Sequence, residues 1–316
     1  MDRLDAMKVF AVAAEAGSLA AAARTLKRSP AAVSRAIAFL EAHLGVALLF
    51  RTTRAMRLTE AGERYAPFCR QLLADLEEAE SQAAGGAADP RGVLTLSAPP
   101  IAGEEILRPI VDAFLQAHPA VSARLLLLDR QVSLVDEGVD LALRVGELAA
   151  SSLMAVRVGA SVRRVIVGAP PYLAARRPLS QPADLAGHDI VAMSHFGEDR
   201  WVFPPASGSA QARTVTFTPR VLVTSVRAAA ASAEAGLGVT RLYSYHVAEQ
   251  VRRGALAIVL ADAEPAPLPV HLVARPGRAT APKVRAFLDL AVPRLRAAFA
   301  GLAEEARALP GVDAPR

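Results

Sequence analysis

The segment SLAAAARTLKRSPAAVSRAIAFLEAHLGVALLFRTTRAMR, residues 18–57, decides the fold of the N-terminal part of the chain. Together with the helix before it, the segment predicts two short helices, a tight turn, a long helix and an arginine-tipped hairpin. Ser29 is a favoured N-cap for the long helix, Pro30 fits its first position, and Gly45 is a favoured C-terminal stop. Ser18 caps the shorter helix through LAAAARTL in the same way. Two helices joined by so short a turn predict a helix-turn-helix that places its second helix in the major groove of DNA.

The long helix has one apolar face and one face suited to DNA. Its apolar residues recur at spacings of four, three and four, which places Val33, Ile37, Leu40 and Leu44 on one buried stripe. On the outward face, small side chains let the helix sit deep in the major groove, and polar side chains can bond to base edges or phosphates. The residues of this helix that we expect to contact DNA are Ser29, Ala31, Ala32, Ser34, Arg35 and Ala38.

A further helix is predicted at the start of the chain. Asp2 and Asp5 form a pair that resembles a capping box. The apolar stripe of this helix consists of Leu4, Met7, Phe10, Ala11 and Ala14. Three helices can therefore share one core.

The residues after Gly45 predict a wing. The apolar run VALLF leads into RTTRAMRLT, where Arg51, Arg54 and Arg57 bracket a short hairpin that can follow phosphates or enter the minor groove. An isolated arginine in so arginine-rich a chain is more often a solvated surface cation, but the position and company of these three favour DNA. The wing residues that we expect to contact DNA are Arg51, Thr52, Thr53 and Arg54.

The positive charge of the chain is concentrated in the same region. Residues 1–58 contain nine Lys and Arg against four Asp and Glu, a balance of +5, whereas the remaining 258 residues contain 27 of each sign. The whole excess of positive charge therefore lies on the predicted DNA-binding head. This distribution is expected where binding depends on neutralising phosphates and releasing counterions.

Length and composition favour a globular, intracellular protein. A chain of 316 residues suggests two or three domains, and 53% hydrophobic residues can fill their cores. The N-terminus begins an amphipathic helix rather than a secretory signal, and no uninterrupted apolar run reaches the length of a membrane span. We therefore expect a cytoplasmic protein without membrane contact.

The sequence carries no motif of an enzyme or a metal site. It contains no glycine-rich phosphate loop with its lysine, no GxSxG elbow and no HExxH. The single cysteine, Cys69, excludes an internal disulfide and falls in a predicted helix, where an inert thiol is expected. The six histidines lack metal-ligand spacing. We expect no catalytic residues, no metal and no cofactor.

The quoted motifs resemble those of LysR-type transcriptional regulators. The resemblance rests on AAARTL, SPAAVSRAIAFLEAHLGVALLFRTTR and LTEAG in the first 62 residues. It continues through DPRGVLTLSAP, LVDEGVDLALRVGEL and AEAGLGVTRL, in that order, to about residue 300. It implies a winged helix-turn-helix, a linker helix that pairs two subunits, and a C-terminal two-lobed α/β domain built like a periplasmic binding protein. The implied partners are operator DNA, a small-molecule effector and further copies of the chain as a dimer or tetramer, with RNA polymerase also to be considered.

A long helix is predicted to follow the wing. With Thr59 as N-cap it continues to the Gly85-Gly86 break, although an interior proline, Pro67, implies that the helix begins near that residue or bends there. GGAADPRG, residues 85–92, reads as a hinge. The apolar side of the helix needs a partner, and a second subunit is the natural one. The residues expected at that interface are Phe68, Leu72, Leu73 and Leu76.

From residue 92 onward strand-like and helix-like segments alternate, which predicts βαβ units, a parallel sheet and an α/β class. The segments VLTLSA, VSARLLLL, VSLVDEG and VDLALRV belong to a first lobe, to which the chain returns through PVHLVAR and a last helix at 282–300. The predicted divisions are the head at 1–58, the linker at 59–88, the effector domain at 89–300 with lobe I at about 91–162 and 267–300 and lobe II at about 163–266, and a tail at 301–316.

A ligand cleft is expected between the lobes, because ligands of open α/β sheets lie beyond the carboxyl ends of strands. Arg144 can pair with a carboxylate there, which would make the effector anionic, or it can form an ion pair with Glu147 or Asp140 instead. Ser97 and Ser225 can also be simple N-caps. His195 and Trp201 line the cleft or pack in the second lobe, and Trp201 favours packing. The effector-binding candidates are Ser97, Pro99, Ile101, Asp129, Arg144, Gly146, Thr224 and Ser225.

These features predict a sequence-specific DNA-binding regulator whose operator binding is modulated by an effector in the cleft. An enzyme lacks support from any motif. A solute-binding protein of the transport type is disfavoured by the lack of an export signal and by the basic N-terminal head. The alternative that stays open is a nucleoid-type DNA-binding protein without an effector. Loss of ligand response with retained DNA binding would favour that alternative.

Overall fold

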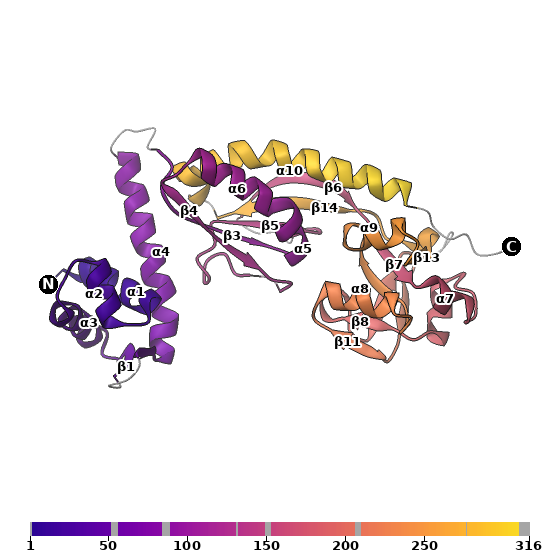
Figure 1. The fold of residues 1–316 in the computed structure, drawn as a ribbon, viewed down its shortest axis with the longest axis horizontal. Coiled ribbons are helices and arrows are strands. Elements are labelled where there is room, and N and C mark those ends of the chain that lie inside the picture. Colours follow the sequence, from indigo (N-terminus) through magenta and orange to yellow (C-terminus); the bar gives the residue numbers. More distant parts are fainter. Residues whose placement is uncertain are drawn as a thin grey trace.

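A computed structural model describes residues 2–51, 56–83, 89–130, 132–148, 153–205, 210–275 and 277–309. Figure 1 shows a helical head at the N-terminus, a long helix beside it, and an α/β module whose two lobes lie one after the other. The predicted class, an α/β chain with a winged helix-turn-helix head, is confirmed. Among the described helices none is by itself long and apolar enough to cross a membrane, and the bent pair at residues 3–25 that passes a test of length and composition forms the core of the head.

The head consists of three helices and a two-stranded wing. Both predicted caps are present: the Ser18 hydroxyl accepts a hydrogen bond from Ala21 N, and the Ser29 hydroxyl accepts one from Ala32 N. The predicted capping box is wrong in one half, because the Asp5 carboxylate forms a bidentate ion pair with Arg28 instead. The elements are α1 (Arg3–Ala16), α2 (Leu19–Thr25), α3 (Pro30–Leu44), β1 (Leu49–Arg51) and β2 (Met56–Leu58).

The long helix α4 (Glu60–Ala83) begins earlier than Pro67, so the expectation of a start near that proline is wrong. The Thr59 hydroxyl accepts a hydrogen bond from Gly62 N at 3.0 Å, which caps the helix as predicted. Packing against the head stabilises the first turns, where the Tyr65 ring lies 6.1 Å from that of Phe10. The predicted hinge lies largely in residues 84–88, outside the described residues.

Cys69 lies on the buried side of α4. Its side chain is fully buried in the core of the head. Burial raises the pKa of the Cys69 thiol to about 11. The thiol is therefore protonated at neutral pH and unreactive, as the sequence predicts.

Lobe I is a five-stranded sheet in the order β4-β3-β5-β14-β6. The prediction of a parallel sheet is only partly correct, because β14 comes back from the second lobe and pairs antiparallel with both β5 and β6. In Figure 1 helices α6 and α10 lie on the same side of this sheet. The strands are β3 (Gly92–Ala98), β4 (Val121–Leu127), β5 (Leu141–Val145), β6 (Met154–Val162) and β14 (Leu268–Ala274); the helical segments are α5 (Pro100–Ala102), a π-helical turn (Gly103–Leu107), α6 (Arg108–Ala117) and α10 (Pro282–Ala308).

Two sequence segments of lobe I differ from the prediction. The segment VSLVDEG forms a turn rather than a strand or helix, and a bidentate ion pair between Arg130 and Glu137 closes it. The last helix does not end at Ala300 but continues to Ala308, so the predicted tail at 301–316 begins too early. Ala303 and Ala306 are buried, and this apolar packing explains the two additional turns.

Lobe II consists of a three-stranded sheet, β12-β7-β13, and two strand pairs, β11 with β8 and β10 with β9. Trp201 is 1% exposed in its core, which confirms packing rather than cleft lining. The strands are β7 (Arg164–Gly168), β8 (Val191–Met193), β9 (Arg200–Phe203), β10 (Arg213–Thr216), β11 (Val221–Val223), β12 (Thr240–Tyr243) and β13 (Ala257–Val259); the helices are α7 (Pro170–Ala174), α8 (Val226–Glu234) and α9 (Ser244–Arg252).

Candidate functional site

The outward face of α3 is open to solvent. Ala31 and Arg35 are exposed, and Ala32, Ser34 and Ala38 are half-buried at the edges of the face. Within the described part of the chain Arg35 has no hydrogen bond or ion pair, so its guanidinium is available to a ligand outside the head. The apolar stripe is buried as predicted for Val33, Ile37 and Leu40, and Ala36 is buried with it. The helix therefore presents small side chains and one arginine outward.

The wing follows α3 in the sequence. Its two strands, β1 and β2, pair antiparallel. Phe50 stands opposite Arg57, and both are exposed. The side chain of Arg51 and the whole of Thr52, Thr53 and Arg54 lie outside the described residues. Of the three predicted wing arginines, Arg57 is therefore the one whose side chain the structure describes.

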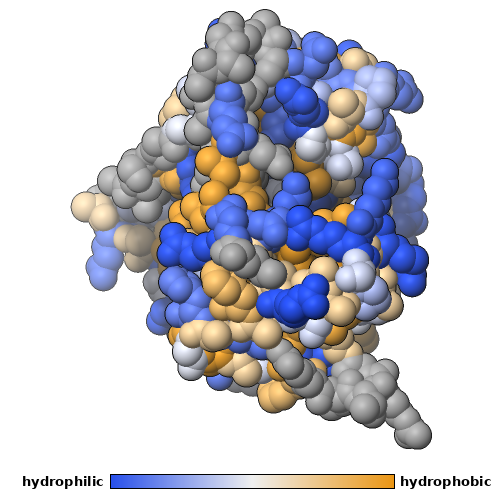
Figure 2. All heavy atoms as spheres, turned by 90° about the vertical axis from the view of Figure 1, so that its left-hand side faces the viewer, coloured by the Kyte–Doolittle hydropathy of each residue, from blue (hydrophilic) through white to orange (hydrophobic). Residues whose placement is uncertain are grey.

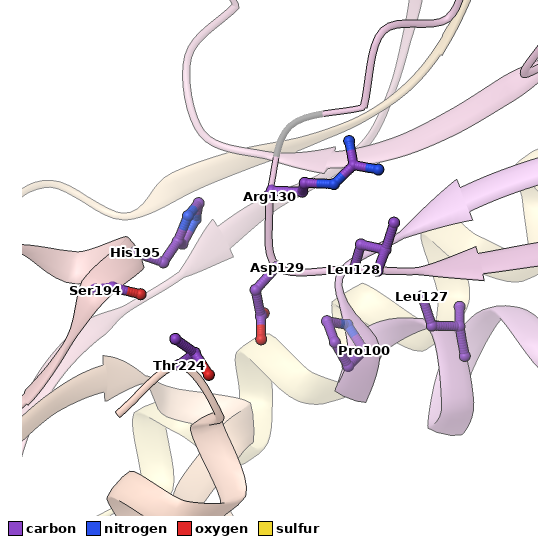
Figure 3. A pocket seen from close by; sticks show the side chains of 8 residues that line it. All are labelled: Pro100, Leu127, Leu128, Asp129, Arg130, Ser194, His195 and Thr224. Atoms are coloured by element: carbon purple, nitrogen blue, oxygen red, sulfur yellow. The ribbon is translucent and has the colours of Figure 1, made fainter. Parts of the chain in front are cut away.

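An interlobe cleft of about 470 Å³ opens between the two halves of the α/β module. In Figure 3 the Asp129 carboxylate points toward Pro100 and Thr224, whereas the Arg130 guanidinium points away from His195. Asp129 and Thr224 were predicted for this cleft, and His195 was weighed for it. Lobe I contributes Pro100, Leu127, Leu128, Asp129 and Arg130, and lobe II contributes Ser194, His195 and Thr224.

A smaller chamber of about 60 Å³ adjoins the cleft, because Leu128, Asp129, Arg130 and His195 line both spaces. We call it the inner chamber and the larger space the outer cleft. Its other lining residues are Pro99, Arg144, Val145, Phe196, Tyr243 and His246. Two predicted residues, Pro99 and Arg144, therefore belong to the inner chamber.

The other predicted effector residues do not line either space. Ser97 and Ile101 are 1% and 5% exposed, and Ile101 belongs to the lobe I core. Ser225 is the N-cap of α8 and accepts a hydrogen bond from Ala228 N at 3.4 Å, which is the alternative considered for it. Gly146 takes a positive φ of 117° directly after β5. A role of these four residues in effector binding therefore stays a prediction that the cleft lining does not support.

Most of the cleft-lining residues of lobe II are not among those predicted from the sequence. Ser194 and His195 directly follow β8, and Tyr243 is the last residue of β12. The rule that ligands lie beyond the carboxyl ends of strands applies to these positions as well as to lobe I. The strand-like segments DIVAMS and LGVTRL carry this signal in the sequence, because Ser194 and Tyr243 lie at or just after the ends of the strands that these segments form.

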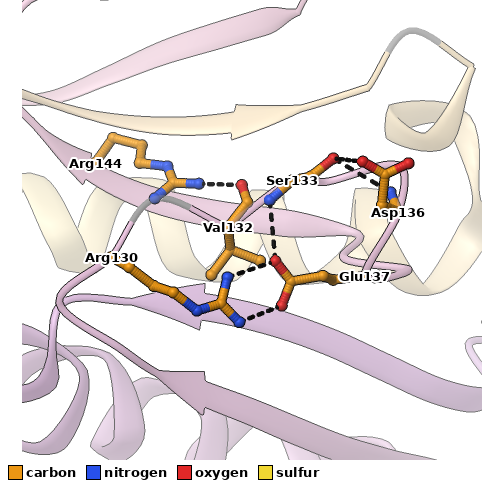
Figure 4. Close-up of polar contacts among 6 residues, drawn as sticks. All are labelled: Arg130, Val132, Ser133, Asp136, Glu137 and Arg144. Carbon is orange, nitrogen blue, oxygen red and sulfur yellow. Dashed lines mark hydrogen bonds and ion pairs between the residues drawn. The ribbon is translucent and has the colours of Figure 1, made fainter. Parts of the chain in front are cut away.

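Arg144 faces the inner chamber without a carboxylate partner among the described residues. Its Nη2 donates a hydrogen bond to the carbonyl oxygen of Val132 at 2.6 Å (Figure 4). Glu137, the nearby acid, already makes two hydrogen bonds of 2.7 Å with Arg130. Burial lowers the pKa of Arg144, and the negative charge of Glu137 partly opposes this effect. The guanidinium is therefore a partly desolvated cation that can accept an anionic ligand.

The ion pairs weighed for Arg144 are not formed. Asp140 is buried, accepts a hydrogen bond from Thr95 N at 2.9 Å and lies 3.6 Å from Lys283 Nζ. Glu147 is exposed and follows Gly146 away from β5. Lys283 on α10 lies beside Asp140 and offsets its charge. The Arg144 guanidinium is therefore left for a ligand in the inner chamber.

His246 contributes a neutral hydrogen-bond donor. Its Nδ1 accepts a hydrogen bond from Tyr243 N at 3.3 Å, so the neutral ring carries its proton on Nε2. Burial lowers the pKa of His246 to about 3, with a smaller contribution from His195. The imidazole is therefore uncharged across the physiological range. Its Nε2 has no partner among the described residues, and the side chain lines the inner chamber.

Asp129 stands where the two spaces meet. Burial raises the pKa of its carboxyl group, and the charge of His195 across the cleft opposes that shift.

Near the mouth of the cleft Arg227 of α8 forms ion pairs with Glu104 at 2.7 Å and Glu105 at 3.3 Å, which connect lobe II to lobe I. No cluster of three His, Cys, Asp or Glu suited to a metal is found in the part of the chain that the structure describes.

Two family models match the chain over its two parts. Residues 4–63 match the bacterial regulatory helix-turn-helix protein, lysR family. Residues 87–296 match the LysR substrate binding domain, which covers the α/β module and its cleft.

Relatives and solved structures agree with these models. The chain is 32% identical to the transcriptional activator AaeR of Escherichia coli over 276 residues, covering 86% of this chain and 87% of that protein. It is 30% identical to the regulator CrgA of Neisseria meningitidis, covering 92% and 96%. The structure of CrgA superposes with a TM-score of 0.56 over 92% of this chain and 98% of that chain at 29% identity. The full-length Vibrio cholerae virulence activator AphB shares the fold, with a TM-score of 0.60 and coverage of 93% and 99% at 24% identity. The chain therefore belongs to the LysR-type transcriptional regulators, with a DNA-binding helix-turn-helix and an effector-binding domain.

Proposed function

We propose that α3 and the wing bind an operator and that a small anionic effector in the interlobe cleft modulates this binding. The single observation that carries the proposal is a cleft lined by both lobes, in a chain whose exposed α3 face offers an unpartnered arginine. A ligand that touches both lobes favours one arrangement of them over others. A coupling of about 1–3 kcal/mol would change operator affinity about 5- to 150-fold.

The proposed DNA contacts divide into two kinds. Arg35 and Ser34 on α3 read base edges, and the small side chains of Ala31 and Ala38 allow the helix to approach. The wing, with Arg57 and the predicted Arg51 to Arg54, contacts the phosphate backbone or the minor groove. The head's net charge of +5 over residues 1–58 supports the second kind of contact.

The anionic character of the effector rests on Arg144. Arg130 is neutralised by Glu137, so Arg144 is the cation that the inner chamber offers to a ligand. A carboxylate would take the guanidinium positions that Val132 leaves open.

We also propose that the chain forms a homodimer through α4. Phe68 is 54% exposed on this helix, and Figure 2 shows apolar surface between hydrophilic bands on the side of the molecule that carries the head. Leu72 and Leu73 are half-buried and pack against the core of their own head. Phe68 is therefore the better candidate for the subunit interface, with Leu76 about two turns further along α4.

The test is a mobility-shift assay with DNA from upstream of the gene and random DNA as competitor. A complex that resists the competitor supports the operator proposal. Weak, salt-sensitive binding to all DNA would instead favour the nucleoid-type alternative. A regulator that activates would in addition contact RNA polymerase, which a transcription assay on the shifted fragment measures.

A further inference from the structure

The inner chamber, a space of about 60 Å³, brings together a cation without a carboxylate partner among the described residues, a neutral donor and a carboxylate, beside Arg130, which is paired with Glu137, and His195. Arg144 supplies the cation and His246 supplies an N–H donor that does not titrate near neutral pH. Asp129 supplies the carboxylate at the junction with the outer cleft. A small ligand that satisfied only the first two groups would leave its own carboxylate close to that of Asp129.

Two like charges so close together are unfavourable in a partly desolvated site. The repulsion disappears if the atom next to the ligand's carboxylate carries a hydrogen-bond donor for Asp129. The outer cleft, about 470 Å³, then receives the rest of the ligand against Pro100, Leu127 and Leu128, with the hydroxyls of Ser194 and Thr224 at its rim. A second acidic group on the ligand would again face Asp129, so dicarboxylates are disfavoured.

We propose that the effector is a small monocarboxylic acid with a hydroxyl or ammonium group on the carbon next to its carboxylate. The carboxylate enters the inner chamber toward Arg144 and His246, and the neighbouring donor faces Asp129. This inference rests on the proposed function, because it assigns a ligand class to the same cleft. It goes further in giving His246 and Asp129 separate tasks in recognition.

Calorimetric titration of the full-length protein with a matched series tests the inference. Phenylacetate carries the carboxylate alone, mandelate adds the hydroxyl, phenylglycine adds the ammonium group, and mandelamide lacks the charge. Propanoate, lactate, alanine and lactamide repeat the series with a smaller body. Within the body that binds, the acid with the donor should bind about tenfold tighter than the acid without it, the effect of one charge-assisted hydrogen bond. The amide should bind more weakly than the hydroxy acid by a similar factor.

Variants assign the two groups. Arg144→Gln should abolish the difference between acid and amide, and Asp129→Asn should remove most of the preference for the ammonium compound. Asparagine can still accept from a hydroxyl, so the preference for the hydroxy acid should fall less. A response confined to phenylglycine or alanine identifies an amino acid, and one confined to mandelate or lactate identifies a hydroxy acid.

Controls separate recognition from folding. Arg108→Gln and Asp112→Asn make the same chemical changes in an exposed ion pair on α6 and should leave binding unchanged. The inference would be overturned if the unsubstituted acid bound as tightly as the hydroxy and amino acids, if Asp129→Asn kept the full preference for the ammonium compound, or if neither series bound at millimolar concentration. If the operator complex then still responds to a different class of compound, the proposed function stands while this ligand class is wrong.

Discussion

Arg35 is the exposed arginine of α3 and has no partner in the described part of the chain. Arg35→Ala should weaken binding to the specific operator by about 1–3 kcal/mol, the range for a bidentate contact with a base, and should weaken binding to random DNA much less. Mobility shift on the two DNAs measures the difference. Arg253→Ala, which removes an exposed arginine of lobe II that pairs with Glu234, is the matched control. Equal losses on both DNAs would contradict base reading by Arg35.

Asp129 should reduce the stability of the free protein at neutral pH. Burial raises the pKa of its carboxyl above the usual 3.8, so the folded state holds the proton more tightly than the unfolded state. The resulting loss of stability is absent below pH 3.8, develops as the pH rises from 3.8 to the folded-state pKa, and is complete above that pKa. Asp129→Asn should therefore be more stable than the native protein near pH 7, and the two should converge toward pH 4. Scanning calorimetry across this range checks the sign, and a less stable variant at pH 7 would show that the carboxylate has a partner in the fold.

At the scale of single residues, local chemistry was predictable and cleft lining was not. Ser18, Ser29 and Thr59 cap their helices because a cap depends only on the next three residues. Ser97 and Ile101 are buried and do not line the cleft, because a strand's alternation and the depth of the following turn decide which side chains face the core. Arg144 lines the inner chamber, but its bond to Val132 depends on a turn that the sequence did not reveal.

At the scale of elements, Gly62 determines how α4 meets the wing. A Cβ at this position would lie 2.1 Å from the carbonyl oxygen of Leu48, the residue just before β1, so the helix start and this backbone could not keep their distance. Gly62→Ala should therefore destabilise the head by about 1–3 kcal/mol or more, although alanine is the better helix former. Hydrogen exchange should show faster exchange in α1, α3 and the start of α4, with the lobes unchanged.

The control for this change is Gly301 in α10. Nothing lies within 4 Å of a Cβ built there, and the residue is exposed. Gly301→Ala should stabilise α10 by up to about 1 kcal/mol because only helix propensity changes. A Gly62→Ala variant that behaves like Gly301→Ala would contradict the close packing of α4 on the wing.

Helix α4 also makes a prediction about assembly. Phe68→Asp should lower the mass of the protein in solution toward that of the monomer, because it places a charge in the proposed subunit interface. Light scattering coupled to size exclusion measures the mass. Phe50→Asp is an equal change on the wing, where the side chain is 58% exposed, and should leave the mass unaltered. An unaltered mass for Phe68→Asp would remove this residue from the interface.

The order of elements followed from the sequence, but the pairing of strands did not. Periodicity and caps located the head helices, β3 and β4. The antiparallel return of β14 between β5 and β6 joins segments that are far apart in the sequence. The hairpin of β9 and β10 forms from polar sequence, which gives a weak strand signal. Helix α10 extends beyond Ala300 because Ala303 and Ala306 are buried. Small side chains give little sign of such burial in the sequence.

At the scale of the whole molecule, charge and cavity are separated. The excess positive charge lies in residues 1–58, and the cleft lies in the α/β module. The two lobes that form the cleft are joined by exposed ion pairs, Arg227 with Glu104 and Glu105 and Arg252 with Glu305, and by a buried apolar cluster that contains residues of both lobes. The exposed ion pairs can break at little cost in free energy, so a ligand that contacts both lobes can change their arrangement where the shared apolar cluster allows it.

The most direct test is operator affinity measured by fluorescence anisotropy with and without a saturating cleft ligand from the mandelate and phenylglycine series. We expect the operator Kd to change at least about fivefold in the native protein and to stay constant in Arg144→Gln. Calorimetry on the same samples reports whether the ligand is bound. A ligand that binds the cleft of the native protein and leaves the operator Kd unchanged would contradict the coupling between the lobes and the head.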